Sequence, residues 1–192
     1  MRQQTFIALL VGVLTAGTAS AQVTFERLLN ADEEPHNWLT YSGTYSSTRH
    51  TRLDQITADN VDDLELSWVF QAGSLEAFQA TPLVVDGIMY LTEPVNNVVA
   101  LDAKTGAVFW KYEYTPSPEA RPCCGAVNRG LAILDDMLFL ATLDGNLMAI
   151  DAIAGEPLWS TTVADPTQGY ALTLAPLVIK DKVIVGVAGA ES

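Results

Sequence analysis

Cys123 and Cys124 are adjacent, and they are the only cysteines in the chain. In an oxidising compartment, two neighbouring thiols can form a disulfide with each other. Their Cα atoms would lie about 3.8 Å apart across a trans peptide, below the usual disulfide range of roughly 4.4–6.8 Å. Such a bond strains the peptide between them, and strain of this kind tends to persist at ligand sites. Zinc is a poor alternative because no second pair exists, whereas two free or buried thiols remain the plain alternative.

Three other residues have side chains that bind ligands in many proteins, but none is diagnostic by itself. Arg129 precedes a glycine, where an arginine is usually a surface salt-bridge residue. Thr173 lies in an apolar run, and threonine is common in strands. Glu191, taken alone, is a solvated carboxylate. The two histidines, His36 and His50, lie far from these residues in the sequence and suggest no site.

The elements that must position these side chains are short strands. From Leu64 onward, runs rich in β-branched and aromatic residues alternate with turn residues, and no helical period separates them. Asp86-Gly87 and Lys180-Asp181 each join two such runs, which predicts two hairpins. Before Leu64 we expect mostly loop, with one short helix near 61–63. The predicted strands are 66–71, 82–85, 88–92, 98–101, 107–112, 132–134, 137–142, 147–150, 158–162, 176–179 and 183–187.

An internal repeat organises these strands. The pattern A-x-D-x-x-x-G-x-x-x-W occurs at 100–110 and again at 149–159, an offset of 49 positions. Glycine suits the turn, aspartate can bond backbone amides across it, and the tryptophan is suited to bridging between sheets. Four short strands in a repeat of about 40–50 residues are typical of a β-propeller blade. We predict an all-β propeller with Trp-docking blades, truncated to about two to three blades, in which Trp68 ends a strand of a preceding blade.

The first residues predict export. Arg2, the apolar run 6–14 and an A-x-A site at 19–21 are typical of a signal peptide. We therefore expect a signal peptide at 1–21, an entry segment at 22–63 and a partial propeller at 64–192, with no integral membrane segment in the mature chain. The expected compartment is the periplasm. A net charge of −13 disfavours nucleic acid as a partner.

The segment 121–130, R-P-C-C-G-A-V-N-R-G, resembles the cofactor-holding segment of quinoprotein methanol and ethanol dehydrogenases. The resemblance extends to N-W-L-T-Y-S-G at 37–43, T-P-L-V-V-D-G at 81–87, the tryptophan repeats and G-A-E at 189–191. It implies an eight-bladed propeller that binds pyrroloquinoline quinone (PQQ) and a metal ion, Ca²⁺ or a lanthanide.

The resemblance also implies roles for particular residues. A disulfide between Cys123 and Cys124 would lie against the quinone, Arg129 would contact the quinone oxygens, and Thr173 would bond the cofactor. Glu191 would ligate the metal. The remaining cofactor-binding positions are Gln79, Ala188, Gly189 and Ala190. Two of them depart from the family pattern, because many members have glutamate at the position of Gln79 and serine at that of Ala188.

The activity implied is oxidation of a primary alcohol, with electrons passed to a cytochrome c. The catalytic base and the other metal ligands would lie beyond Ser192, so we expect the intact protein to be an enzyme and this fragment to be inactive alone. One alternative is a non-catalytic periplasmic Trp-propeller scaffold, which the repeat alone would support equally. Another is a PQQ enzyme that acts on sugars or aldehydes.

Overall fold

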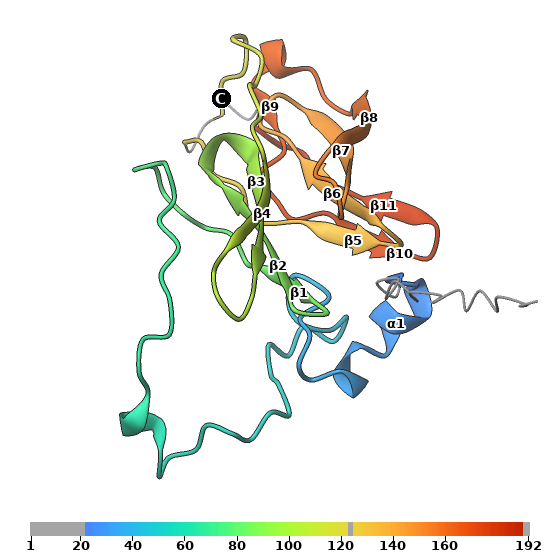
Figure 1. The fold of residues 1–192 in the computed structure, drawn as a ribbon. Coiled ribbons are helices and arrows are strands. Elements are labelled where there is room, and N and C mark those ends of the chain that lie inside the picture. The colour runs from blue at the N-terminus through green and yellow to red at the C-terminus, as the bar shows by residue number, and fades with distance from the viewer. Residues whose placement is uncertain (1–21, 123–124, 190–192) are drawn as a thin grey trace, which may run out of the picture.

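The computed structural model describes residues 22–122 and 125–189, and most of its regular structure consists of antiparallel strands (Figure 1). Two four-stranded sheets lie side by side, and in each the strands follow their order along the chain. The first sheet contains β1 (Leu83–Val85), β2 (Ile88–Glu93), β3 (Asn97–Asp102) and β4 (Val108–Tyr112). The second contains β5 (Ala132–Leu134), β6 (Met137–Ala141), β7 (Asn146–Asp151) and β8 (Pro157–Thr162).

Two smaller pairs of strands follow. The hairpin of β10 (Leu177–Ile179) and β11 (Lys182–Ile184) has β10 in contact with β5, so it stands next to the second sheet. A short pair joins β9 (Tyr170–Ala171) to β12 (Ala188–Gly189). Two blades and the first hairpin of a third therefore stand in a row, which confirms the prediction of a partial propeller.

Most predicted strands occur within one to three residues of their expected bounds, but the strand predicted at 66–71 is wrong. Leu66 and Val69 are 81% and 72% exposed in irregular chain. Trp68 and Phe70 pack on side chains of β2 and β3. No described strand pairs with this segment to complete a hydrogen-bond ladder, and β-propensity alone does not make a strand. For the same reason Trp68 does not end a strand. The sequence also did not predict β9, β12 or helix α1 (Phe25–Leu29).

The core lies between the sheets. Leu83 of β1, Val98 of β3, Leu138 of β6 and Ile150 of β7 are completely buried in one apolar cluster. Each such side chain contributes about 2 kcal/mol when it leaves water. The strands β3, β6 and β7 each have four consecutive buried residues, so both faces of the sheets are covered at these strands.

Tryptophan joins one blade to the next, as the repeat predicted. The indole of Trp110, on β4, lies against Gly155 of the second sheet, where an added Cβ would be only 2.6 Å from the ring. Its Nε1 donates a hydrogen bond to the Ala152 carbonyl at 3.1 Å. Trp68 lies against Gly106 in the same way, although its segment is not a strand. In both turns the repeat's aspartate accepts two backbone N–H bonds, at Asp102 and at Asp151.

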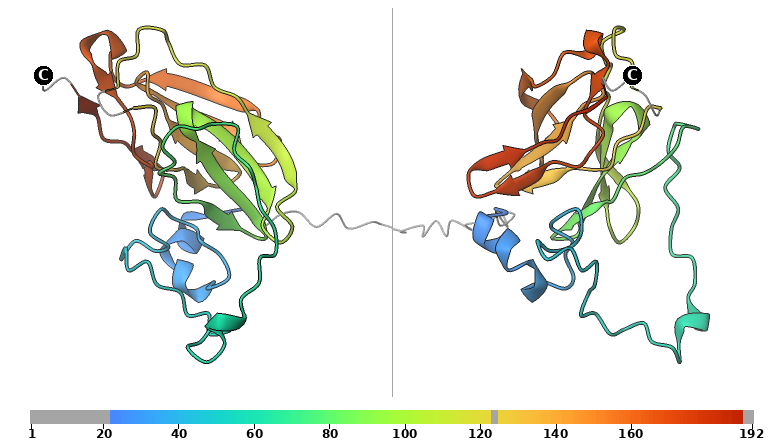
Figure 2. Two further views of the ribbon diagram at one scale, coloured as in Figure 1. Left: turned by 90° about the vertical axis from the view of Figure 1, so that its left-hand side faces the viewer. Right: turned by 180° about the vertical axis from the view of Figure 1, so that it is seen from behind.

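The entry segment packs below the sheets and contacts two hairpin turns and strand β10 (Figure 2). Arg27, on α1, pairs with Asp86 in the β1–β2 turn. Val23 exchanges backbone hydrogen bonds with Asp135 in the β5–β6 turn. Tyr45 donates to the Val178 carbonyl of β10 at 2.5 Å. The predicted short helix is present at Val61–Asp63. No helix within 22–122 or 125–189 is long and apolar enough to cross a membrane.

Candidate cofactor site

Arg129 lies where three segments of the fold meet, each just before the first strand of its blade or hairpin. Its backbone carbonyl accepts a hydrogen bond from Thr81, and its backbone N–H donates to the Thr173 carbonyl, both at 3.1 Å. Its guanidinium Nη1 donates to the same carbonyl at 3.1 Å and to Thr173 Oγ1 at 2.8 Å. The approach of these backbones is close, because a Cβ at Gly130 would lie 2.8 Å from the Thr81 carbonyl. Arg129 is thus held in one orientation while remaining half-buried.

A cavity of about 300 Å³ opens beside this arginine, near the lower limit for small-molecule sites. Apart from Arg129, its described lining residues have small or apolar side chains. The lining residues are Val127, Arg129, Gly169, Ala171, Thr173, Ala188 and Gly189. One charged group over small, flat walls suits a planar anionic ligand, since a guanidinium offers a rigid fork of donors.

One wall of the cavity depends on a backbone contact. β9 pairs with β12, which places Gly189 against Tyr170. Gly189 has φ +99°, and a Cβ there would lie 2.1 Å from the Gly169 carbonyl. Only glycine fits this position, so the cavity keeps a wall without a side chain.

The structure brings together four of the residues predicted from the sequence: Arg129, Thr173, Ala188 and Gly189. Gln79 is exposed and does not line the cavity, although it stands two residues before Thr81, whose N–H donates to Arg129. Cys123, Cys124, Ala190 and Glu191 lie outside the described residues, as does the predicted signal peptide at 1–21.

Three lining residues were not predicted: Val127, Gly169 and Ala171. Their small apolar side chains carry no chemical signal in the sequence. Gly169 alone carries a signal in the sequence, because a glycine shortly after Pro166 is typical of a turn. In the structure it follows the 3-10 turn Pro166–Gln168 and has φ +81°. No group of three or more His, Cys, Asp or Glu side chains within the described ranges is arranged to hold a metal ion.

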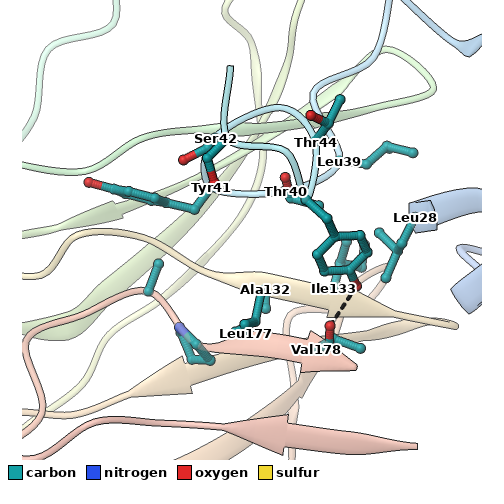
Figure 3. A pocket seen from close by; sticks show the side chains of 14 residues that line it. Leu28, Leu39, Thr40, Tyr41, Ser42, Thr44, Ala132, Ile133, Leu177 and Val178 are labelled. Atoms are coloured by element: carbon teal, nitrogen blue, oxygen red, sulfur yellow. Dashed lines mark hydrogen bonds between the residues drawn. The ribbon is translucent and has the colours of Figure 1, made fainter. Parts of the chain in front are cut away.

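A second cavity, of about 250 Å³, lies between the entry segment and strands β5 and β10 (Figure 3). Leu28, Leu39 and Ile133 form its apolar walls (Figure 3). Thr40 and Tyr45 also line it. Burial raises the pKa of Tyr45. This cavity shares no lining residue with the one beside Arg129, so the two are separate.

The sheets and the docked tryptophans define a β-propeller protein with a candidate ligand site near the start of the first strand in each blade. Residues 38–192 match the PQQ family model described as "Glucose/ethanol/alcohol dehydrogenase, beta-propeller domain", and the chain belongs to this family.

Curated relatives agree with this assignment. The chain is 38% identical over 184 residues to the quinoprotein alcohol dehydrogenase PedH of Pseudomonas putida KT2440, covering 95% of this chain and 31% of that protein. It is 40% identical over 180 residues to the lanthanide-dependent methanol dehydrogenase of Methylacidiphilum fumariolicum SolV, covering 91% and 30%. The chain therefore spans less than a third of the length of these relatives.

Solved structures show the same fold. The quinohemoprotein alcohol dehydrogenase ADHIIG of Pseudomonas putida HK5 matches with a TM-score of 0.81 at 38% identity, over 89% of this chain and 26% of that one. A europium-containing methanol dehydrogenase also matches at 0.81, with 41% identity over 85% and 29%. BamB of Moraxella catarrhalis, at 20% identity and a TM-score of 0.53, shares the fold alone.

Proposed function

We propose that this chain forms one wall of the cofactor site in a PQQ-dependent dehydrogenase that oxidises primary alcohols. The observation that carries the proposal is Arg129, held against Thr173 beside a cavity with flat glycine and alanine walls. PQQ is planar and carries carboxylates and quinone oxygens, and this cavity offers a planar cationic donor and walls free of large side chains. The names of the relatives support the same chemistry.

Each described residue has a distinct task in this proposal. Arg129 would donate hydrogen bonds to the quinone oxygens, and its permanent charge would stabilise negative charge there. Thr173 orients Arg129 and offers its hydroxyl to the cofactor. Ala188 and Gly189 let the cofactor approach the backbone of β12. When bound, PQQ supplies the two-electron acceptor that takes hydride from the alcohol carbon.

The remaining parts of the site rest on the family resemblance. A disulfide between Cys123 and Cys124 would cover one face of the quinone, and Gln79 and Ala190 would complete the binding residues. Glu191 would supply carboxylate oxygens to Ca²⁺ or a lanthanide, which both prefer oxygen ligands. We further propose export to the periplasm through the signal peptide at 1–21, and a cytochrome c as electron acceptor.

Quinone binding to the full-length protein tests the proposal. The purified apoprotein is titrated with PQQ in the presence of Ca²⁺ or La³⁺, and retained quinone absorbance and alcohol-dependent dye reduction are measured. Arg129→Ala is expected to weaken PQQ binding about 100-fold, because a charge-assisted donor is lost. Arg52→Ala is the matched control, since Arg52 is exposed, its guanidinium donates to the Asp32 carbonyl within the entry segment, and it does not line the cavity.

Two results would overturn the proposal. A wild-type protein that retains no quinone would favour the scaffold alternative. Equal loss of binding in the Arg129 and Arg52 variants would mean that the cavity beside Arg129 does not hold the cofactor. A panel of alcohols, sugars and aldehydes with the same dye separates the proposed substrate class from the other quinoprotein substrates.

A further inference from the structure

Asp144, in the turn between β6 and β7, is a buried carboxylate that is satisfied without a cation. Asp144 is only 6% exposed. None of the ion pairs among the described residues includes it. Tyr114 donates its hydroxyl to both carboxylate oxygens, at 2.8 and 2.9 Å. The Thr142 hydroxyl donates at 2.6 Å and the Ser117 backbone N–H at 2.8 Å. Asp144 thus ties its own turn to the segment that follows β4.

These donors also set the charge of the Asp144 carboxyl group. Burial alone would raise the pKa of Asp144, but the hydrogen bonds from Thr142, Ser117 and Tyr114 outweigh it and hold the pKa below its usual value. The carboxylate is therefore ionised at neutral pH. Charge-assisted hydrogen bonds of this kind are about twice as strong as neutral ones, so the turn is firmly held.

The same turn contacts two of the three segments that line the cofactor cavity, those of Arg129 and Thr173. The Ala141 carbonyl, at its start, accepts a hydrogen bond from the buried Asn128 side chain at 2.9 Å, one residue before Arg129. The Thr142 carbonyl accepts from the Leu172 N–H at 3.2 Å, one residue before Thr173. The residues directly before Arg129 and Thr173 are therefore both hydrogen-bonded to this turn.

The blade fold does not itself require an aspartate here. At the offset of 49 positions, Val95 occupies the matching place in the turn between β2 and β3 of the first sheet. That sheet forms with the same strand order and no carboxylate at this position. The acid in the second sheet is an addition at the one described turn that supports both Arg129 and Thr173.

We infer that Asp144 is a positioning residue that fixes the β6–β7 turn and, through it, the relative placement of Arg129 and Thr173. For its effect on the cofactor, this inference rests on the proposed function. Asp144 touches neither residue directly and acts through Thr142. The Thr142 hydroxyl donates a hydrogen bond to Asp144, and the Thr142 carbonyl accepts one from the Leu172 N–H.

The test compares Asp144→Asn with Asp151→Asn in the full-length protein. Asp151 ends the same strand, β7, and also accepts two backbone N–H bonds, from Ile153 and Ala154 at 2.8 Å, but at the end of the strand remote from the cavity. In the absence of cofactor, Asp144→Asn is expected to speed amide hydrogen exchange at 127–130 and 171–173 about tenfold. It should also weaken PQQ binding about tenfold. Asp151→Asn should change neither quantity.

Each result decides between the inference and its failure. Unchanged exchange at these amides in Asp144→Asn, or equal acceleration in both variants, would overturn the inference. Faster exchange with undiminished PQQ affinity would also overturn it, since the turn would then not set the cofactor contacts. If the wild type binds no PQQ, the proposed function fails while the exchange measurement still decides the positioning role. Tyr114→Phe removes one donor alone; it should act in the same direction, about threefold, and takes the place of Asp144→Asn if that variant does not fold.

Discussion

The two four-stranded sheets match strand for strand at an offset of 49 positions, yet their second turns are stabilised differently. In the first sheet, Glu93 is 2% exposed and pairs with Lys111 of β4 at 2.8 Å. In the second sheet the matching residues are Thr142 and Ser160, which are uncharged, and Asp144 is held by hydroxyl and amide donors instead. One turn relies on an ion pair between a buried carboxylate and a partly exposed lysine, and the other on neutral donors.

The difference follows what each turn supports. Asn96, in the first turn, donates to the Ala141 carbonyl and accepts from the Leu143 N–H, so the first turn supports the second. The second turn supports the segments of Arg129 and Thr173. Two sheets with the same strand order can therefore have turns that make different contacts. In this chain the first turn contacts the second, and the second contacts the segments of the candidate cofactor site.

The largest effect is expected from the tryptophans that join the blades. Trp110→Ala should lower the free energy of unfolding by about 4 kcal/mol, because it removes a large ring packed on Gly155 and a hydrogen bond to Ala152. Trp159 is the equivalent residue in the second sheet but is 41% exposed, so Trp159→Ala should cost only about 1 kcal/mol. Urea unfolding of the two variants measures both values. Equal losses would break the comparison, because the greater exposure of Trp159 would then not reduce its contribution.

The ion pair of the first turn gives the next effect. Lys111→Ser leaves the buried Glu93 carboxylate without its cation and should cost about 3 kcal/mol. The double change Glu93→Thr with Lys111→Ser installs the residues of the second sheet and should recover most of that loss, since no buried charge remains. A double-mutant cycle by urea unfolding gives the coupling energy. A coupling near zero would show that the pair contributes nothing to the turn.

The smallest effect is expected at the opposite ends of the blades and depends on pH. Hydrogen bonds from Arg27 hold the pKa of Asp86 below its usual range, so Asp86 binds a proton less readily in the folded protein than in the unfolded chain. The stabilisation is therefore complete above pH about 4 and is lost as pH falls through the lower, folded pKa. Asp86→Asn should cost about 1 kcal/mol at pH 7 and a smaller amount at about pH 2.

Asp135 provides the control for this prediction. It occupies the matching place in the second sheet but contacts the entry segment through its backbone, with Val23. Asp135→Asn should therefore change the free energy of unfolding little at either pH. A penalty for Asp86→Asn that is undiminished at acid pH would show that the ion pair with Arg27 is not its cause.

Local patterns made most of the fold predictable. The hairpins at Asp86-Gly87 and Lys180-Asp181 combine turn residues with flanking apolar runs, and both formed where expected. The strands β9 and β12 have two residues each, too few for a period, and their pairing depends on tertiary contacts. The segment around Trp68 has strand-like composition, but whether it pairs depends on a neighbour that composition does not specify.

The candidate site was predictable in a different way. Arg129 and Thr173 stood out through the family resemblance, not through their own spacing, and their contact spans 44 positions. Gly169 and Ala171 join them only because β9 pairs with β12. The support from Asp144 could not be predicted, because the aspartate reads as an ordinary turn residue until its donors from Tyr114 and Ser117 are seen.

The docking of Trp110 on Gly155 also bears on how such a chain can grow over evolutionary time. The first repeat has both halves of this contact: its Gly106 turn receives the indole of Trp68, and its Trp110 packs on Gly155 of the second repeat. A duplicated repeat would arrive with both halves of the contact already present, and a deleted repeat would leave a matching pair behind. Blade number could therefore change by whole units without a new interface having to arise, as expected where each repeat contacts only its neighbours.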